Sequence, residues 1–131
     1  MTIINLTLGK ATPEQIEAGV VDLPDVQYEK LCELLTFDAL PTGFEMCKRA
    51  NAIANLLESS ARPLRIPLIE GKVCAMIGGE PFFTRFLESF IRGRWVTPCY
   101  AFSKRVSVEK QMPGGTVVTE VVLKHVGCLH V

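Results

Sequence analysis

The sequence has no net charge and no long apolar run, and each absence excludes a class of protein. Its 14 basic residues balance 14 acidic ones, so binding to long duplex nucleic acid, which depends on a basic excess, is disfavoured. No stretch approaches the ~20 apolar residues that cross a bilayer. The first residues contain no basic segment followed by an apolar one, as a signal peptide would. We therefore expect a cytoplasmic protein without a membrane partner.

The sequence also lacks closely spaced metal ligands. Its five cysteines are Cys32, Cys47, Cys74, Cys99 and Cys128. No pair is separated by only two to four residues, whereas a zinc site normally has at least one such pair. Most of these cysteines lie in apolar segments, where a free thiol behaves as a small buried side chain. We therefore expect reduced thiols, no metal and no other cofactor.

What is present is typical of a folded globular chain. Hydrophobic residues make up 48% and charged residues 21% of the 131 residues. This length is close to the commonest domain size and is enough to bury a core without disulfides. We expect one domain that covers residues 1–131.

The first half of the chain predicts one strand followed by helices. Residues 2–8 are rich in β-branched side chains and predict a buried strand. Thr12, Pro13 and Gln15 fit a helix start with a capping box, and Val20 and Val21 weaken the end of that short helix. Further helices are predicted over residues 25–35 and from the capping box at residues 42–45 to about residue 59.

The second half predicts strands around one more helix. Residues 64–66 are compatible with a short strand, and residues 72–77 form an apolar run typical of a central parallel strand. A helix begins at Pro81 and ends at Gly93, and a strand follows over residues 97–102. Residues 105–110 and 116–126 flank a turn at residues 112–115 and predict a terminal hairpin. The fold class is α/β: a three-layer Rossmann-like domain with a mostly parallel sheet and a C-terminal antiparallel β-hairpin.

The predicted ligand site lies at the carboxyl ends of the parallel strands, where open sheets bind ligands. Gly78 and Gly79 have no Cβ, so their backbone can approach a ligand closely. The helix that begins at Pro81 directs its free N–H groups to the same space and favours an anion there. Glu80 can occupy that anion position itself. The alternative is a tight turn that only packs the helix against the strand.

A second polar group lies in residues 103–109. On a strand, Ser103, Arg105, Ser107 and Glu109 share one side, and Arg105 can bind phosphate through two parallel hydrogen bonds. The alternative is the exposed face of an edge hairpin with an Arg–Glu pair. His125, one of only two histidines, is a candidate acid or base, or simply a strand residue.

Several segments together resemble a family of small bacterial proteins associated with mobile elements and defence loci. They are residues 5–7, 11–15, 35–38, 75–82 and 100–109. This family is similar to the small CRISPR-associated Rossmann-fold (CARF-like) proteins, which implies binding of cyclic oligoadenylates and, in some members, their cleavage. A Gln-His pair follows the first strand in that pattern, whereas this chain has Leu8 and Gly9, which implies binding without turnover.

Two functions from different classes follow. The first is a nucleotide-binding protein that binds or slowly cleaves cyclic oligoadenylate-type signalling nucleotides as a homodimer, without a metal. The residues expected to bind the ligand are Asn5, Thr7, Gly78, Gly79, Glu80, Pro81, Ser107 and Glu109. Those expected to act in cleavage are Ser103, Arg105 and His125. The second is a non-catalytic interaction module of a mobile genetic element, in which the hairpin docks a partner or a second copy.

Overall fold

The fold is built on one five-stranded sheet with the strand order β2-β1-β3-β4-β5. The computed structural model describes residues 1–131. The strands are β1 (Thr2–Asn5), β2 (Val20–Asp22), β3 (Val73–Met76), β4 (Thr97–Gln111) and β5 (Val117–His130). β1 to β4 run parallel to their neighbours, and β5 is antiparallel to β4. This confirms the predicted α/β class with a mostly parallel sheet and a terminal hairpin.

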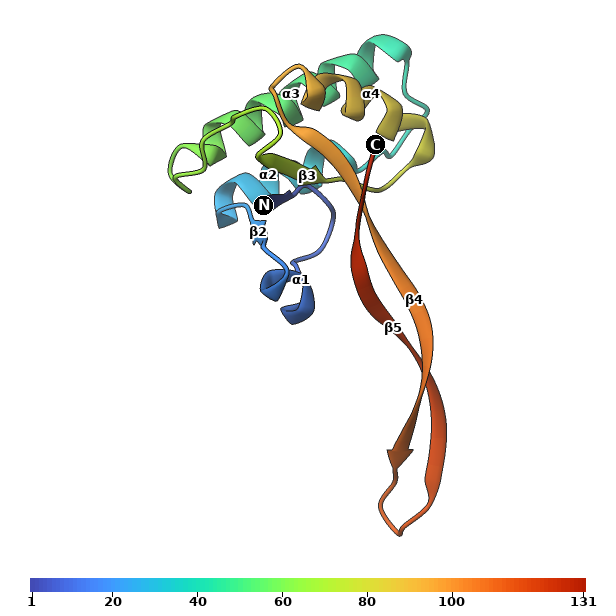
Figure 1. Cartoon of the computed structure of the whole chain (residues 1–131). Helices are drawn as coiled ribbons and strands as arrows, with labels where there is room; N and C mark the ends of the chain where they lie inside the picture. Colours follow the sequence, from blue (N-terminus) through green and yellow to red (C-terminus); the bar gives the residue numbers. More distant parts are fainter.

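Helices lie on both faces of the sheet but cover them unequally (Figure 1). The helices are α1 (Pro13–Glu17), α2 (Asp25–Leu35), α3 (Gly43–Ala61) and α4 (Pro81–Arg92). α2, α3 and α4 pack on one face and form a core of 15 buried residues with the sheet. The other face has a buried cluster of only four residues, and the short α1 lies over it. The arrangement is a Rossmann-like three-layer fold whose third layer is thin.

β3 shows why the sheet centre is the most buried part of the molecule. All four of its residues are buried, because helices cover alternate side chains on opposite faces. Val73 and Ala75 belong to the larger core, whereas Cys74 and Met76 belong to the smaller cluster. The prediction of a central strand covered on both sides is confirmed. None of the helices is long and apolar enough to cross a membrane.

The helix starts agree with the local signals in the sequence. Thr12 and Gln15 form a reciprocal capping box, and Pro13 occupies the first turn of α1. Thr42 accepts a hydrogen bond from the Glu45 N–H at 3.1 Å and caps α3. α2 begins and ends where the apolar spacing predicts.

Two short segments differ from the expectation. Val20 and Val21 belong to β2, which pairs with β1, and do not simply weaken a helix. Residues 64–66 form no strand; they follow α3 in a turn, in which Arg65 has a φ of 57°. Val20 and Val21 have a neighbouring strand with which to pair and residues 64–66 have none, and the local pattern does not contain that information.

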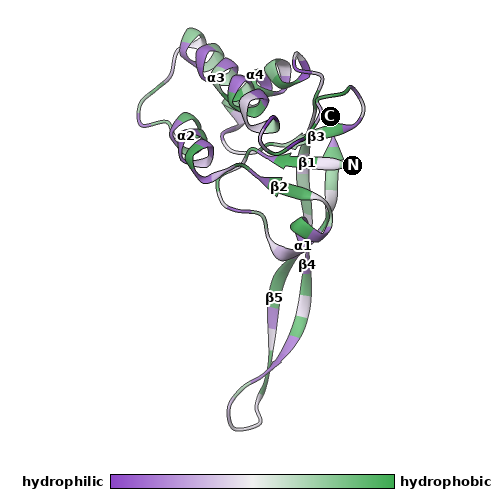
Figure 2. Cartoon of the chain, turned by 90° about the vertical axis from the view of Figure 1, so that its left-hand side faces the viewer, coloured by the Kyte–Doolittle hydropathy of each residue, from purple (hydrophilic) through white to green (hydrophobic).

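The largest difference concerns the hairpin. β4 does not end near residue 102 but continues to Gln111, and with β5 it forms a two-stranded ribbon that projects from the body (Figures 1 and 2). We call residues 103–125 the arm and the rest of the molecule the body. A bulge marks the start of the arm: Phe102 pairs with Gly127 and Ser103 with His125, so Val126 is the extra residue. Bulges bend and twist a strand, which explains why the ribbon leaves the plane of the body here.

Candidate functional site

At the carboxyl end of β1, the polar groups of Asn5 are used within the protein. Asn5 is 2% exposed, and its amide donates to Asp22 Oδ1 at 2.8 Å and to the Gly9 carbonyl at 3.1 Å. Its Oδ1 accepts from the backbone N–H of Thr7 at 3.0 Å and from the Thr7 hydroxyl at 2.6 Å. Because these groups satisfy one another, Asn5 stabilises the loop after β1 and has no free group for a ligand.

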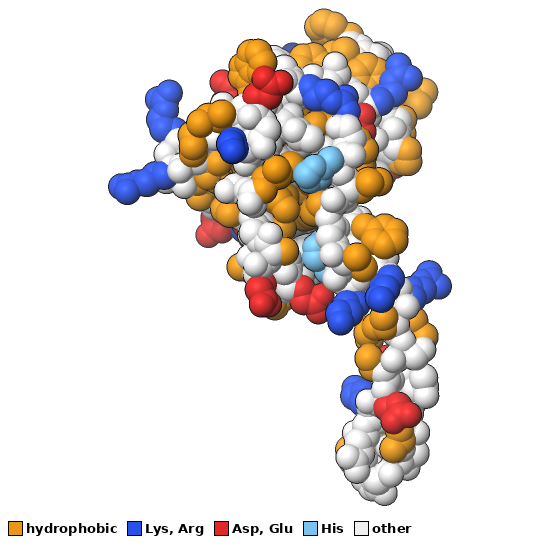
Figure 3. Space-filling model, viewed as in Figure 1, with side chains coloured by type: hydrophobic (Ala, Val, Ile, Leu, Met, Phe, Trp, Pro, Cys, Tyr) orange, Lys and Arg blue, Asp and Glu red, His pale blue; other side chains and the backbone are white.

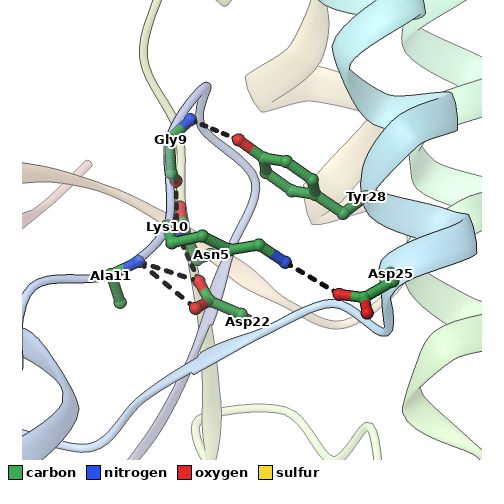
Figure 4. A network of polar contacts seen from close by, with 7 residues as sticks. All are labelled: Asn5, Gly9, Lys10, Ala11, Asp22, Asp25 and Tyr28. Carbon is green, nitrogen blue, oxygen red and sulfur yellow. Dashed lines mark hydrogen bonds and ion pairs between the residues drawn. The ribbon is translucent and has the colours of Figure 1, made fainter.

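The same network holds the rest of this loop (Figure 4). The Gly9 N–H donates to the Tyr28 hydroxyl at 2.8 Å, and the Ala11 N–H donates to Asp22 Oδ1 at 3.0 Å. Lys10 pairs with Asp25 at 3.2 Å and lies 4.1 Å from the centre of the Tyr28 ring. Sequence reasoning missed Asp22 and Tyr28. Recognition of β2 would have placed Asp22 at the carboxyl end of a strand next to β1.

Residues 78–81 lie at the same edge, as predicted. A Cβ built on Gly78 would lie 3.6 Å from Thr7 Cγ2, so the loops after β1 and β3 meet there. Gly79 has a φ of +108°, a conformation that glycine adopts without strain, and faces open space. Glu80 is the N-cap residue of α4, but its side chain makes no capping hydrogen bond. The amides at the start of α4 therefore have no side-chain partner from the cap.

Ser103 and His125 form a second group at the start of the arm. They are directly opposite in the β4–β5 register and line a cavity of about 330 Å³ with residues 12–15 and Leu123. The backbone N–H of His125 donates to Glu14 Oε2 at 3.3 Å. The ring atom Nδ1 of His125 is buried without a hydrogen-bond partner. His125 Nδ1 accepts no hydrogen bond from the Ser103 hydroxyl. The two residues meet, but without the bonding that activates a serine.

Arg105, Ser107 and Glu109 lie farther out, on the arm. They are exposed and pair across the ribbon with Leu123, Val121 and Thr119, respectively. The ion pairs of the structure include neither Arg105 nor Glu109, so the Arg–Glu pair of the alternative interpretation is not formed.

The structure therefore does not gather the predicted site residues into one pocket. The cavity lined by Ser103 and His125 contains none of residues 78–81, and Arg105 lines neither group. The physical reason is the length of β4: the expected strand end at residue 102 is absent, and the ribbon carries Arg105 away along the arm. The catalytic roles expected for Ser103, Arg105 and His125 stay predictions.

Three thiols lie on neighbouring strands of the thinly covered face: Cys74 on β3, Cys99 on β4 and Cys128 on β5. Burial raises the pKa of Cys99, and the nearby Cys128 and Cys74 raise it further. Burial also raises the pKa of Cys74, with Cys128 acting in the same direction. All five cysteines are free, and no three His, Cys, Asp or Glu side chains are placed to hold a metal ion.

The strand order and the helices on both faces define the class: an α/β protein with an open Rossmann-like sheet and an extended terminal hairpin. Within that class, the chain belongs to the family of the uncharacterized protein MJ1673, whose model matches residues 1–128. No curated protein and no solved structure matches the chain. The description of the family names no activity, so the resemblance to CARF-like proteins stays a prediction.

Proposed function

We propose that this protein is an interaction module that assembles with a second copy of itself through the arm. The observation that carries this proposal is the exposure of apolar side chains along the arm. Val117 is 58% exposed, Val121 62% and Leu123 71%. Val108, Met112 and Val118 are exposed as well. Exposed apolar side chains that gather on one segment in this way indicate an interaction site in soluble proteins.

The architecture of the arm supports the same conclusion. An isolated two-stranded ribbon is only marginally stable in water, and three or more strands with a covered apolar face are needed for independent stability. The sheet ends at β5, so the outer edge of β5 has no strand beside it. An unpaired edge is a template on which another strand can add. A second copy would supply the missing strand and place its own apolar side chains beside those of the arm.

An apolar hollow of about 350 Å³ lies at the start of the arm. It is lined by Phe102, Val126, Gly127, Cys128 and Leu129. The contact surface therefore extends from the arm onto the body.

Assembly is tested by measuring molar mass in solution with sedimentation velocity from about 1 to about 100 µM protein. The wild-type chain is expected to form a dimer, and Val121→Glu is expected to be monomeric, because it places a carboxylate against the apolar side chains of the partner at the contact. Val26→Glu is the matched control: Val26 is 77% exposed on α2, so this variant is expected to remain dimeric. A monomeric wild type at the highest concentration would rule out the proposal.

A second candidate function is nucleotide binding at the edge formed by Thr7 and residues 78–81. It is supported by the exposed glycine turn before α4, whose N-cap side chain makes no hydrogen bond. A thermal-shift comparison of linear nucleotides with cyclic oligoadenylates tests it, because a ligand at about 100 times its dissociation constant stabilises the folded state by ~2.7 kcal/mol. Gly79→Asp would abolish a genuine shift. An unchanged melting temperature with every nucleotide would contradict this candidate.

A further inference from the structure

The outer half of β5 has a charge and apolar pattern that is complementary to itself. Around Val122, Glu120 precedes and Lys124 follows at equal spacing, and Val121 and Leu123 occupy the positions between. When two copies of such a strand run antiparallel with Val122 opposite Val122, each Glu120 lies opposite a Lys124. Each Val121 then lies opposite a Leu123. A segment of this kind can pair with its own copy about a two-fold axis.

The edge of β5 is free where this pattern lies. β5 is the last strand of the sheet, and no other element runs along its outer edge in the arm (Figures 1 and 2). At the start of the arm, α1 approaches the strand, and Glu14 accepts a hydrogen bond from the His125 N–H. The open stretch therefore extends from Val117 to Lys124 and contains the complete pattern.

We propose that two copies pair antiparallel along β5, with the two-fold axis at Val122, and so join their arms into one four-stranded sheet. This proposal rests on the function proposed above and defines the surface that each copy presents. Each arm adds a strand to the other, so both ribbons reach the strand number that an independent sheet needs. The pairing is isologous and closes at two copies, which prevents further growth along this edge.

The charges of the arm favour this register. Lys104 and Lys124 are directly opposite each other across the ribbon. Repulsion between two like charges in this position is destabilising. Neither lysine forms an ion pair within the chain. Figure 3 shows that basic side chains gather where the arm leaves the body. In the proposed register, the partner's Glu120 lies opposite Lys124 and relieves this repulsion.

Pairing along β4 is the competing arrangement, and the charges disfavour it. About Ser107, each Arg105 would lie opposite a Glu109, but each Lys104 would lie opposite a Lys110. That register adds two contacts between like charges and leaves the opposed lysines of the ribbon unrelieved. β5 is therefore the edge to which we assign the contact.

Charge reversal tests the register. Glu120→Lys places two lysine pairs across the axis, and Lys124→Glu places two glutamate pairs there, so each variant alone is expected to dimerise at least about tenfold more weakly. Mixing the two variants pairs every new lysine with a glutamate, so a heterodimer of wild-type affinity is expected. The double variant Glu120→Lys/Lys124→Glu is expected to recover homodimerisation. Sedimentation velocity and native mass spectrometry measure these species.

Glu109→Lys is the matched control, because it makes the same charge change in the same arm but on β4. It is expected to leave the dimer intact. Loss of the dimer in Glu109→Lys but not in Glu120→Lys would overturn the β5 register. Failure of the mixed variants to form a heterodimer would also overturn it, while assembly through the arm would stand if Val121→Glu still dissociates the wild-type dimer. A monomeric wild type would overturn both.

Discussion

The body and the arm contain similar apolar strand sequences, but these strands differ in burial. β3 and the outer half of β5 are both rich in apolar residues, yet every residue of β3 is buried and no residue of β5 is. β3 has a neighbouring strand on each side and is covered on both faces, whereas the arm has neither a cover nor a strand beyond β5. The comparison indicates that the apolar side chains of a strand require another element to pack against them. That element can belong to the same chain or to another chain.

The comparison also shows that the body, and not the arm, contains the core that stabilises the fold. The core of 15 residues lies entirely in the body, and the arm contributes none of them. Loss of apolar contacts should therefore destabilise the body strongly and the isolated arm weakly. The following changes test this difference, with the largest expected effect first.

Removal of a core side chain should have the largest effect. Leu57 on α3 is fully buried, so Leu57→Ala is expected to lower the free energy of unfolding by about 2–5 kcal/mol, through lost burial and the cavity left behind. Leu123→Ala on the arm is the control and is expected to change it by less than about 0.5 kcal/mol in the monomer. Urea denaturation in the Val121→Glu background measures both. Equal effects would contradict the division between body and arm.

Loss of the Asn5 side chain should have the next largest effect. Asn5→Ala leaves the Thr7 N–H and the Gly9 carbonyl without their present partner, and removes the bond to Asp22. We expect a loss of about 1–3 kcal/mol of unfolding free energy, measured by urea denaturation. The exposed Asn55, which accepts a hydrogen bond from Arg94, offers a matched control. Asn55→Ala should cost less than about 0.5 kcal/mol, and an equal cost would argue against a structural role for Asn5.

Alkaline pH should destabilise the body through its buried thiols. Burial raises the pKa of Cys99 and Cys74 above the value of about 8.5 for an unfolded thiol, so the folded state retains protons that the unfolded state loses. Their contribution is complete below about pH 8.5 and is lost as the pH rises toward the folded pKa, by up to about 1.4 kcal/mol per pH unit for each thiol. Chemical denaturation from pH 7 to pH 10 measures it. Cys99→Val should reduce the slope and Cys32→Val should not; a slope unaffected by Cys99→Val would refute this assignment.

Removal of the arm should have the smallest effect on the folded body. With an Asn-Gly turn in place of residues 104–124, Ser103 and His125 still pair, and Asn-Gly suits a two-residue hairpin. The free energy of unfolding of the monomer is expected to change by less than about 1 kcal/mol. Circular dichroism during urea denaturation measures it, with the Val121→Glu monomer as reference. A body that no longer folds would show that the arm is part of its core.

Elements decided by local chemistry could be predicted from the sequence. Thr12 and Thr42 have the side-chain oxygens that cap a helix, and both helices begin there. Gly114 and Gly115 adopt positive φ angles in the turn of the hairpin, where glycine is favoured. In each case the signal and the structure lie within a few residues of each other.

Elements decided by distant contacts could not be predicted. β2 has only three residues and exists because β1 pairs with it, so its sequence alone was ambiguous. The predicted site residues lie apart in part for the same reason. Ser103 and His125 come together through strand pairing, but Arg105 leaves the edge because β4 continues past the body.

By itself, the sequence determined where the capped helices begin, most of the helices and strands, and the turn at the end of the arm. These depend on capping, side-chain periodicity and glycine conformation, which act over a few residues. Only the tertiary structure decided which apolar strands are covered and where β4 leaves the body. Whether a strand is covered depends on elements that are distant in the chain. The local sequence around a valine on β5 therefore does not show whether a helix packs against it.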